Sequence, residues 1–222
     1  MPTIVVASPK GGAGKSTTAV LLGTELARGG IPVTMLDCDP NHSLTLWAER
    51  GPLPERITVQ SDVTEASIVR TIKAHDADGQ VVVVDLEGVA SRLVSRAISQ
   101  ADLVLTPMRA TTLDATIGAR ALELIAEEEE ALDREIPHAV VFTMTKAIQS
   151  KQHKGIEASL RNQGIDVIDP SLMERAAFSG IFAFGGDLHS MPAQGNMESA
   201  RDNARAFAMQ VYKRLAAERN DE

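Results

Sequence analysis

Residues 8–18, which read Ser-Pro-Lys-Gly-Gly-Ala-Gly-Lys-Ser-Thr-Thr, constrain the fold of this chain more than any other stretch. They follow a short β-branched run over residues 3–7 and precede a helical pattern over residues 17–28, which ends at two glycines. A glycine-rich turn between a buried strand and a helix points backbone N–H groups and the positive end of the helix at an anion. The stretch therefore predicts a phosphate-binding loop. The alternative is a turn that only connects the two elements.

The loop is a variant of the Gly-x-x-x-x-Gly-Lys-Ser/Thr pattern, because Pro9 stands at the position of the first glycine. Lys15 is expected to bind the β- and γ-phosphates of a nucleotide, and Ser16 to offer its hydroxyl to Mg²⁺. Lys10 adds a second positive charge at the start of the loop. The residues expected to bind the nucleotide are Lys10, Gly11, Gly12, Ala13, Gly14, Lys15, Ser16 and Thr17.

Two further predicted strands end in carboxylates. An apolar run starting at residue 31 leads into Asp37 and Asp39, and four consecutive valines lead into Asp85. Open α/β sheets bind ligands at the carboxyl ends of their strands, so we expect Asp37 and Asp85 to organise Mg²⁺ and Asp39 to orient the attacking water. Alternatively, one of the first two aspartates caps the following helix and the other is solvated. Glu87 is either a switch residue that senses the γ-phosphate or an exposed acid.

Strands and helices alternate along the rest of the chain, which predicts a doubly wound α/β fold with a mainly parallel sheet flanked by helices. Residues 51–64 show no clear pattern. We expect one domain over residues 1–222. Beyond the elements already named, helices are expected over residues 91–100, 113–133, 149–162 and 198–219, and strands over 102–106, 139–143 and 165–168.

The motifs resemble those of the ParA/MinD family of deviant P-loop ATPases. The resemblance rests on Lys-Gly-Gly-x-Gly-Lys-Ser-Thr-Thr near the N-terminus, on Asp-x-Asp-Pro at residues 37–40 and on Asp85 after the valines. Two motifs are similar to those of short, ParF-like plasmid partition ATPases. They are residues 39–47, and Leu105-Thr106-Pro107 followed by Leu113-Asp114. Residues 173–178 are similar to VirC-type accessory ATPases of T-DNA transfer. Asn41 stands where the family has Gln. With only seven residues before Ser8, we expect no N-terminal helix-turn-helix.

The resemblance implies an ATPase of weak intrinsic activity that forms an ATP-dependent sandwich homodimer, with Lys10 reaching the phosphates bound by the other subunit. It further implies nonspecific DNA binding, and release when a ParB- or ParG-like or other partner protein stimulates hydrolysis. The function implied is plasmid or chromosome partition or cargo positioning, with nucleoid association in the ATP-bound state. Two alternatives stay open: an accessory ATPase of conjugative or T-DNA transfer, and a small-molecule kinase or ligase of the same P-loop class.

Composition limits these possibilities. The chain contains one cysteine, Cys38, so it cannot build a disulfide framework or hold a cysteine-ligated cluster within one subunit, as nitrogenase iron-protein relatives do in pairs. We expect Cys38 to be a packing residue. The absence of a long apolar run and of a signal pattern predicts a cytoplasmic protein. Phe207, Val211 and Leu215 form a narrow stripe on the last helix, which favours docking on the domain over membrane binding.

The net charge of −8 does not attract DNA to the protein as a whole. DNA binding would therefore need a local basic patch, whose side chains would contact the backbone without reading bases. The alternative for each candidate is a solvated surface charge. The candidates are Lys146, Lys151, Lys154, Arg161, Arg175, Arg201, Arg205, Lys213 and Arg214.

Overall fold

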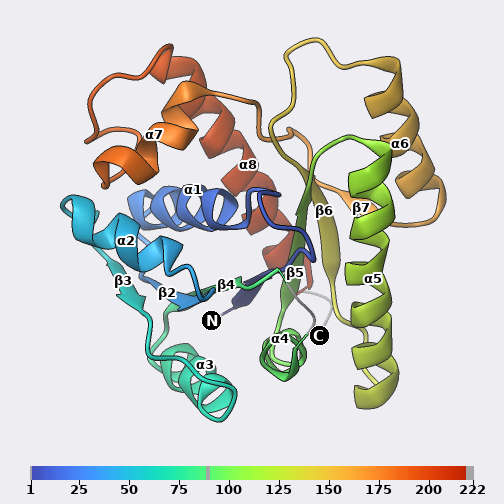
Figure 1. Ribbon diagram of the computed structural model, residues 1–222. Helices are drawn as coiled ribbons and strands as arrows, with labels where there is room; N and C mark the ends of the chain where they lie inside the picture. The colour runs from blue at the N-terminus through green and yellow to red at the C-terminus, as the bar shows by residue number, and fades with distance from the viewer. Residues whose placement is uncertain (1, 89–90, 219–222) are drawn as a thin grey trace.

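The computed structural model describes residues 2–88 and 91–218, and it contains a seven-stranded parallel sheet with helices on both faces (Figure 1). The strand order is β3-β2-β4-β1-β5-β6-β7. This confirms the doubly wound, parallel α/β architecture predicted from the alternation of elements. The strands are β1 (Thr3–Val6), β2 (Val33–Cys38), β3 (Ile57–Gln60), β4 (Val81–Leu86), β5 (Leu103–Met108), β6 (His138–Phe142) and β7 (Asp166–Val167).

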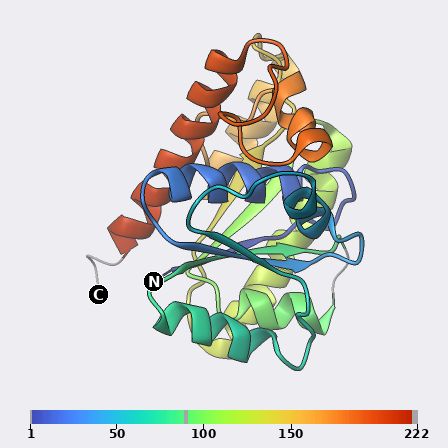
Figure 2. The ribbon, with the colours of Figure 1, turned by 90° about the vertical axis from the view of Figure 1, so that its left-hand side faces the viewer.

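The helices form two layers, one on each side of the sheet (Figures 1 and 2). Helices α1, α2, α7 and α8 cover one face, and α3, α4 and α5 cover the other, while α6 packs near β6 and β7. Their bounds are α1 (Lys15–Arg28), α2 (Ser43–Arg50), α3 (Ile68–Ala77), α4 (Arg92–Ile98), α5 (Thr112–Leu132), α6 (Lys151–Asn162), α7 (Ala176–Phe184) and α8 (Met197–Glu218).

The central strands are apolar on both faces because both faces are covered. In β1, Ile4 and Val6 pack with α1 and α8, while Val5 packs with the helices of the opposite layer. The four valines of β4 divide in the same alternating way between the two cores. A strand buried on both sides has no solvent-facing position for a polar residue, which explains its continuous apolar run.

Three elements were not predicted, namely β3, α3 and α7, and α2 was expected without bounds, as the helix that follows Asp39. Strand β3 lies at the edge of the sheet inside the stretch without a clear pattern, and only its first residue, Ile57, is buried. Helix α3 buries only Ile68 and Ile72. Short elements with so few buried positions leave a weak periodic signal. The predicted end of the last helix, at residue 219, lies outside the described residues.

Helix α8 packs along α1 through its apolar stripe. Phe207, Val211 and Leu215 are at most 4% exposed, as expected for a helix that docks on the domain. The stripe follows the four-residue spacing that keeps side chains on one helical face. Within residues 2–88 and 91–218, we find no helix with the length and hydropathy required to cross a bilayer.

A close backbone contact joins α2 to the segment after α7. Trp47 is fully buried, and its indole Nε1 donates a 2.9 Å hydrogen bond to the Gly186 carbonyl. Gly185 has a φ of +71°, and a Cβ built on it would lie only 2.4 Å from the Gly51 nitrogen. Both the backbone angle and the lack of space require glycine here.

Candidate functional site

The predicted phosphate loop lies at the carboxyl edge of the sheet, between β1 and α1. Gly12 and Gly14 have φ angles of +72° and +92°, which residues other than glycine rarely adopt. Within the described chain, the backbone N–H groups of Gly11, Gly12 and Gly14 donate no hydrogen bond. Unpaired backbone donors of this kind need an external acceptor. The loop is therefore shaped to bind an anion.

The start of α1 adds positive charge to this loop. Gly14 is the N-cap and offers no side-chain cap, and the first turn contains no acid. Lys15 is only 7% exposed, and a Cβ built on Gly88 would lie 3.5 Å from its Nζ. The lysine ammonium thus lies between the loop and the end of β4, on the side where a nucleotide phosphate would be held.

Side chains from later strands support the loop. Thr143, directly after β6, donates a 2.7 Å hydrogen bond from Oγ1 to the Ala13 carbonyl. Its methyl group lies close to Gly14, since a Cβ there would be 3.3 Å from Thr143 Cγ2. Arg109 donates from Nη2 to the Gly12 carbonyl at 3.4 Å. These contacts could not be predicted from local patterns, because they join residues 130 and 97 positions apart.

Two buried carboxylates lie side by side next to the loop. Asp37 and Asp85 are register partners on adjacent strands and are 1% and 0% exposed. Asp37 Oδ1 and both oxygens of Asp85 have no hydrogen-bond partner among the described residues. Burial raises the pKa of Asp85 to about 7, against the opposing effects of Ser16 and Lys15.

Unpaired carboxylate oxygens beside a phosphate loop fit Mg²⁺. This ion prefers oxygen ligands and usually binds through one or two carboxylates together with substrate phosphates and water. The described residues contain no group of three or more His, Cys, Asp or Glu that could hold a metal alone. A site with two carboxylates therefore suits a metal that arrives with a nucleotide.

One oxygen of Asp37 is engaged by the helix that follows. Oδ2 accepts hydrogen bonds from the backbone nitrogen of Thr45, at 2.8 Å, and from Thr45 Oγ1, at 2.7 Å. Asp37 thus binds the start of the next helix through one oxygen, as in the capping alternative. Its other oxygen, Oδ1, has no partner among the described residues. Thr45 orients the group that we expect to face the metal.

Asp39 is held by the residue that departs from the family pattern. It is 8% exposed, and its Oδ1 accepts from the Asn41 backbone nitrogen at 2.9 Å and from Asn41 Nδ2 at 2.7 Å. The asparagine therefore fixes the orientation of Asp39. Between the two acids, Cys38 packs in the core, and burial raises the pKa of its thiol to about 12. The cysteine is thus an inert packing residue, as expected.

Lys10 forms an ion pair within its own chain. Its Nζ donates to Asp114 Oδ1 at 2.5 Å, and Asp114 is 4% exposed. Asp114 also accepts a hydrogen bond from Thr111 Oγ1 and donates its backbone N–H to that hydroxyl at 3.1 Å. Burial raises the pKa of Asp114, but the hydrogen bonds from Lys10 and Thr111 outweigh it and hold the pKa below its ordinary value.

The pairing of Asp114 with Lys10 was not predicted from the sequence, although the sequence does indicate that Asp114 lies at the start of a helix. Thr111 is the N-cap of α5, and Asp114 follows it by three residues, which is the spacing of a capping box. That pattern predicts the helix start and not the lysine that pairs with the acid. Glu87 is half-buried directly after β4.

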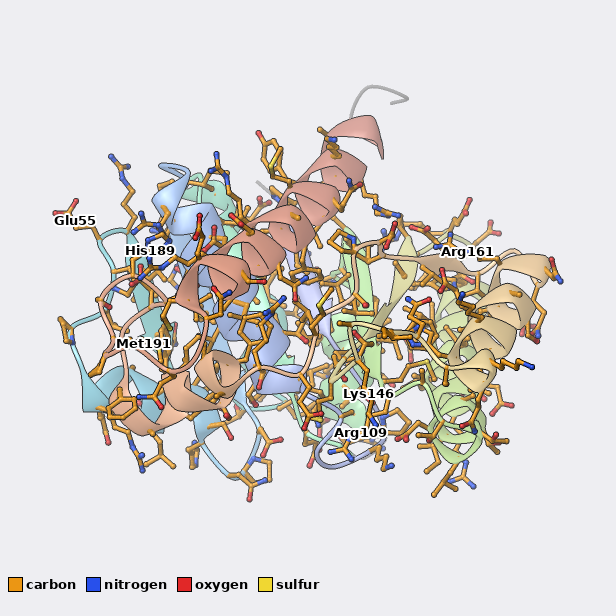
Figure 3. The ribbon with its side chains drawn as sticks, turned by 90° about the horizontal axis from the view of Figure 1, so that it is seen from above. Glu55, Arg109, Lys146, Arg161, His189 and Met191 are labelled. Atoms are coloured by element: carbon orange, nitrogen blue, oxygen red, sulfur yellow. The ribbon has the colours of Figure 1, made fainter. Side chains whose placement is uncertain are left out.

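The predicted DNA-binding residues are distributed over several elements. Lys146 and Arg175 line one hollow of about 520 Å³, while Arg201 and Arg205 line another between α1 and α8. Lys151 and Lys154 are exposed on α6. Figure 3 shows Arg161 and His189 toward opposite sides of the molecule.

Not all of these cations are free to meet a ligand. Arg201 donates from Nε to the Leu188 carbonyl at 2.8 Å, and Arg214 forms an ion pair with Asp166. Arg161 is paired with Glu157 at 3.0 Å. Arg175 donates from Nη2 to Met173 Sδ at 3.3 Å, but its buried Nε has no partner among the described residues. The exposed or unpaired candidates are the better ones for contacts with phosphates.

Comparisons with known proteins agree with this geometry. The family model described as the CobQ/CobB/MinD/ParA nucleotide binding domain matches residues 4–187. Protein ParA of Rhizobium radiobacter is 68% identical over 217 residues, covering 97% of this chain and 98% of that protein. Protein virC1 of the same organism is 26% identical over 188 residues, covering 82% of this chain and 80% of that protein.

A solved structure matches over nearly the same length. The ATP complex of a McdA variant from Cyanothece superposes with a TM-score of 0.75 at 19% identity, covering 96% of each chain. At this identity, the likeness supports the fold alone.

Proposed function

The chain belongs to the family of CobQ/CobB/MinD/ParA nucleotide-binding domains, and from this premise we propose that it is a ParA-type ATPase that switches between monomer and ATP-bound dimer. Residues 1–222 would act as one ATPase domain in the cytoplasm, on the nucleoid when ATP is bound. The dimer would bind DNA without sequence preference to position a plasmid, chromosome or other cargo. A centromere-binding or other partner protein would release it by stimulating hydrolysis.

The observation that carries this proposal is the pair Asp37–Asp85, in which Asp37 Oδ1 and both Asp85 oxygens have no partner among the described residues, beside a loop with unpaired N–H groups. Mg²⁺ bound with ATP would neutralise negative charge on the phosphates. Asp37 and Asp85 would hold the ion, together with Ser16. Residues 10–17 would bind the phosphates through backbone N–H groups and Lys15. Together they position the nucleotide, which is the main contribution of protein groups to phosphoryl transfer.

Hydrolysis would depend on two further groups. Asp39, oriented by Asn41, would orient the attacking water. Lys10 would leave Asp114 and reach the phosphates bound by a second subunit. A cation supplied in trans can raise the rate of phosphoryl transfer by orders of magnitude. Slow intrinsic turnover is therefore expected from the monomer.

Three variants test the nucleotide cycle. Lys15→Ala should lose ATP binding, whereas Lys10→Ala should bind ATP but stay monomeric. Asp39→Ala should form a dimer that persists with ATP. Fluorescent ATP-analogue binding and size-exclusion chromatography with ATP measure these outcomes, and Lys73→Ala, an exposed lysine on α3, is the control. An Asp39→Ala protein that remains monomeric with ATP contradicts the proposal.

DNA binding can be assigned to one surface by paired substitutions. The pairs are Lys146 with Arg175, Lys151 with Lys154, and Arg201 with Arg205, each changed to alanine. Binding to nonspecific duplex DNA with ATP should weaken with rising salt, and each lost phosphate contact should reduce the salt slope by about one. ATP turnover that ignores DNA at every salt concentration and rises with a small acceptor would instead identify a kinase or ligase.

The similarity to virC1 supports one alternative, an accessory role in conjugative or T-DNA transfer. The chemistry of the site would be unchanged, and only the partner would differ. Stimulation of ATP hydrolysis by a purified centromere-binding protein would support the partition function. Stimulation by a relaxase or coupling protein alone supports the transfer role.

A further inference from the structure

Two consecutive carbonyl groups of the phosphate loop are held by side chains from outside the loop. Thr143, directly after β6, donates from Oγ1 to the Ala13 carbonyl at 2.7 Å. Arg109, directly after β5, donates from Nη2 to the Gly12 carbonyl at 3.4 Å. The ends of two strands thus hold the loop backbone on its carbonyl side.

The bond from Thr143 is the firmer of the two, because both of its partners are buried. Thr143 is 4% exposed and Ala13 is 1% exposed, so water has little access to this hydrogen bond. Arg109 and Gly12 are both exposed and the distance between them is longer, so water can replace the guanidinium. The loop backbone therefore depends mainly on Thr143.

The Ala13 carbonyl has no other donor among the described residues. The Thr143 hydroxyl also lies 3.3 Å from the Met108 carbonyl, but it carries a single hydrogen. The Met108 carbonyl already accepts the Thr143 backbone N–H at 2.9 Å and does not need the hydroxyl. The hydroxyl hydrogen is therefore directed to Ala13.

A fixed carbonyl also fixes the N–H group of the same peptide unit. In a trans peptide, the C=O and the N–H point in opposite directions. Because the Ala13 carbonyl is directed at Thr143, the Gly14 N–H is directed away from it, and it donates no hydrogen bond within the described chain. The Thr143 methyl group contacts the other half of this unit, since a Cβ built on Gly14 would lie 3.3 Å from Cγ2.

We infer that Thr143 is a positioning residue for nucleotide binding, which keeps the Gly14 N–H directed into the phosphate site before the nucleotide arrives. The role rests on the proposed function, which identifies the anion as a nucleotide phosphate, and it adds a residue outside 10–17 to that site. Without the hydroxyl, the buried Ala13 carbonyl has no partner, and the peptide unit is free to rotate toward another donor. Affinity then falls with the fraction of molecules that keep the productive orientation.

The effect of Thr143 is expected on binding and not on the chemical step. The backbone N–H groups of such a loop contact the α- and β-phosphates, which ATP and ADP share. Losing an interaction that is equal in the bound substrate and in the transition state weakens binding and leaves kcat unchanged. Loss of the hydroxyl should therefore weaken ATP and ADP to the same extent.

Thr143→Val and Thr143→Ser separate the hydroxyl from the rest of the side chain. Valine keeps the branched shape but cannot donate, so the Kd of ATP and of ADP, each with Mg²⁺, should rise about tenfold, which corresponds to about 1.4 kcal/mol. Serine keeps the donor and should bind both nucleotides within about threefold of the wild type. Isothermal titration calorimetry measures the Kd, and hydrolysis at saturating ATP measures kcat, which should be unchanged in both variants.

Thr106→Val is the matched control. Thr106 is 1% exposed, and its hydroxyl has no hydrogen-bond partner among the described residues. The same change of a buried threonine to valine should therefore leave both dissociation constants unchanged. If Thr143→Val does not fold, Thr143→Ala compared with Thr143→Ser repeats the removal of the donor in a smaller side chain.

A second measurement needs no nucleotide. In the NMR spectrum of the nucleotide-free, full-length chain, the Gly14 amide resonance should broaden in Thr143→Val, because the peptide unit exchanges between orientations, and should stay sharp in Thr143→Ser. Equal weakening of ATP and ADP in Thr143→Val together with this broadening supports the role of Thr143.

Three results would overturn it: a valine variant with wild-type affinity, a serine variant as weak as the valine variant, or a loss in kcat at unchanged Kd. If the wild-type chain binds neither ATP nor ADP, the proposed function fails, and the Gly14 resonance alone then decides whether Thr143 orients the loop.

Discussion

The ion pair between Lys10 and Asp114 predicts that the chain restrains its own dimerisation. In the proposed dimer, Lys10 leaves Asp114 and reaches the other subunit, so each dimer breaks two such pairs. A hydrogen bond between charged groups contributes about 1.5–3 kcal/mol. The Lys10 side chain is 31% exposed, so the lower end, about 1.5 kcal/mol per subunit, is appropriate. Removing both pairs should favour the dimer by about 3 kcal/mol, or roughly a hundredfold in its dissociation constant.

Asp114→Asn removes the charge while keeping the shape of the side chain near Thr111. Sedimentation equilibrium with a slowly hydrolysed ATP analogue measures the dissociation constant of the dimer, and Glu127→Gln, an exposed acid on the same helix, is the matched control. We expect tighter dimerisation for Asp114→Asn alone. An unchanged or weaker dimer would refute the idea that Asp114 competes with the second subunit for Lys10.

Three further predictions concern stability, measured by chemical unfolding. Trp47→Phe should lower the unfolding free energy by about 2–4 kcal/mol, through lost packing and an unpaired carbonyl, whereas Leu46→Ala at an exposed position should change it by under about 0.5 kcal/mol. Burial raises the pKa of Asp187, but hydrogen bonds from its own loop outweigh burial and hold that pKa below its ordinary value. The ionised Asp187 therefore stabilises the fold at pH values above its ordinary pKa, and this stabilisation is lost as pH falls through the lowered pKa of the folded state. Asp187→Asn should lower the unfolding free energy by about 1–2 kcal/mol at neutral pH and by progressively less in acid. Gly185→Ala should destabilise more than Gly164→Ala, since both have positive φ but only the first meets backbone atoms; equal losses would contradict a clash.

The phosphate loop and the parallel sheet could be predicted because local residue types carry that information. Glycines at 12 and 14 and the lysine at 15 imply a loop geometry, and acids after apolar strands imply a position at the sheet edge. The paired placement of Asp37 and Asp85 follows once β2 and β4 are neighbours.

Contacts between distant residues could not be predicted in the same way. Lys10 and Asp114 are separated by 104 positions, and neither motif indicates the other. Strand β3 carries little pattern because an edge strand buries few side chains. The supporting role of Thr143 depends on how β6 ends beside the loop, which is a property of the assembled sheet.

The place of β1 between β4 and β5 affects the order in which a newly synthesised chain can fold. The first strand leaves the ribosome without either of its neighbours, which end only at residues 86 and 108. Thr143, which supports the phosphate loop, emerges later still. At a synthesis rate of about 5–20 residues per second, β1 waits on the order of ten seconds for these partners. The nucleotide loop, although made before β2 to β7, is among the last parts of the sheet edge to be completed.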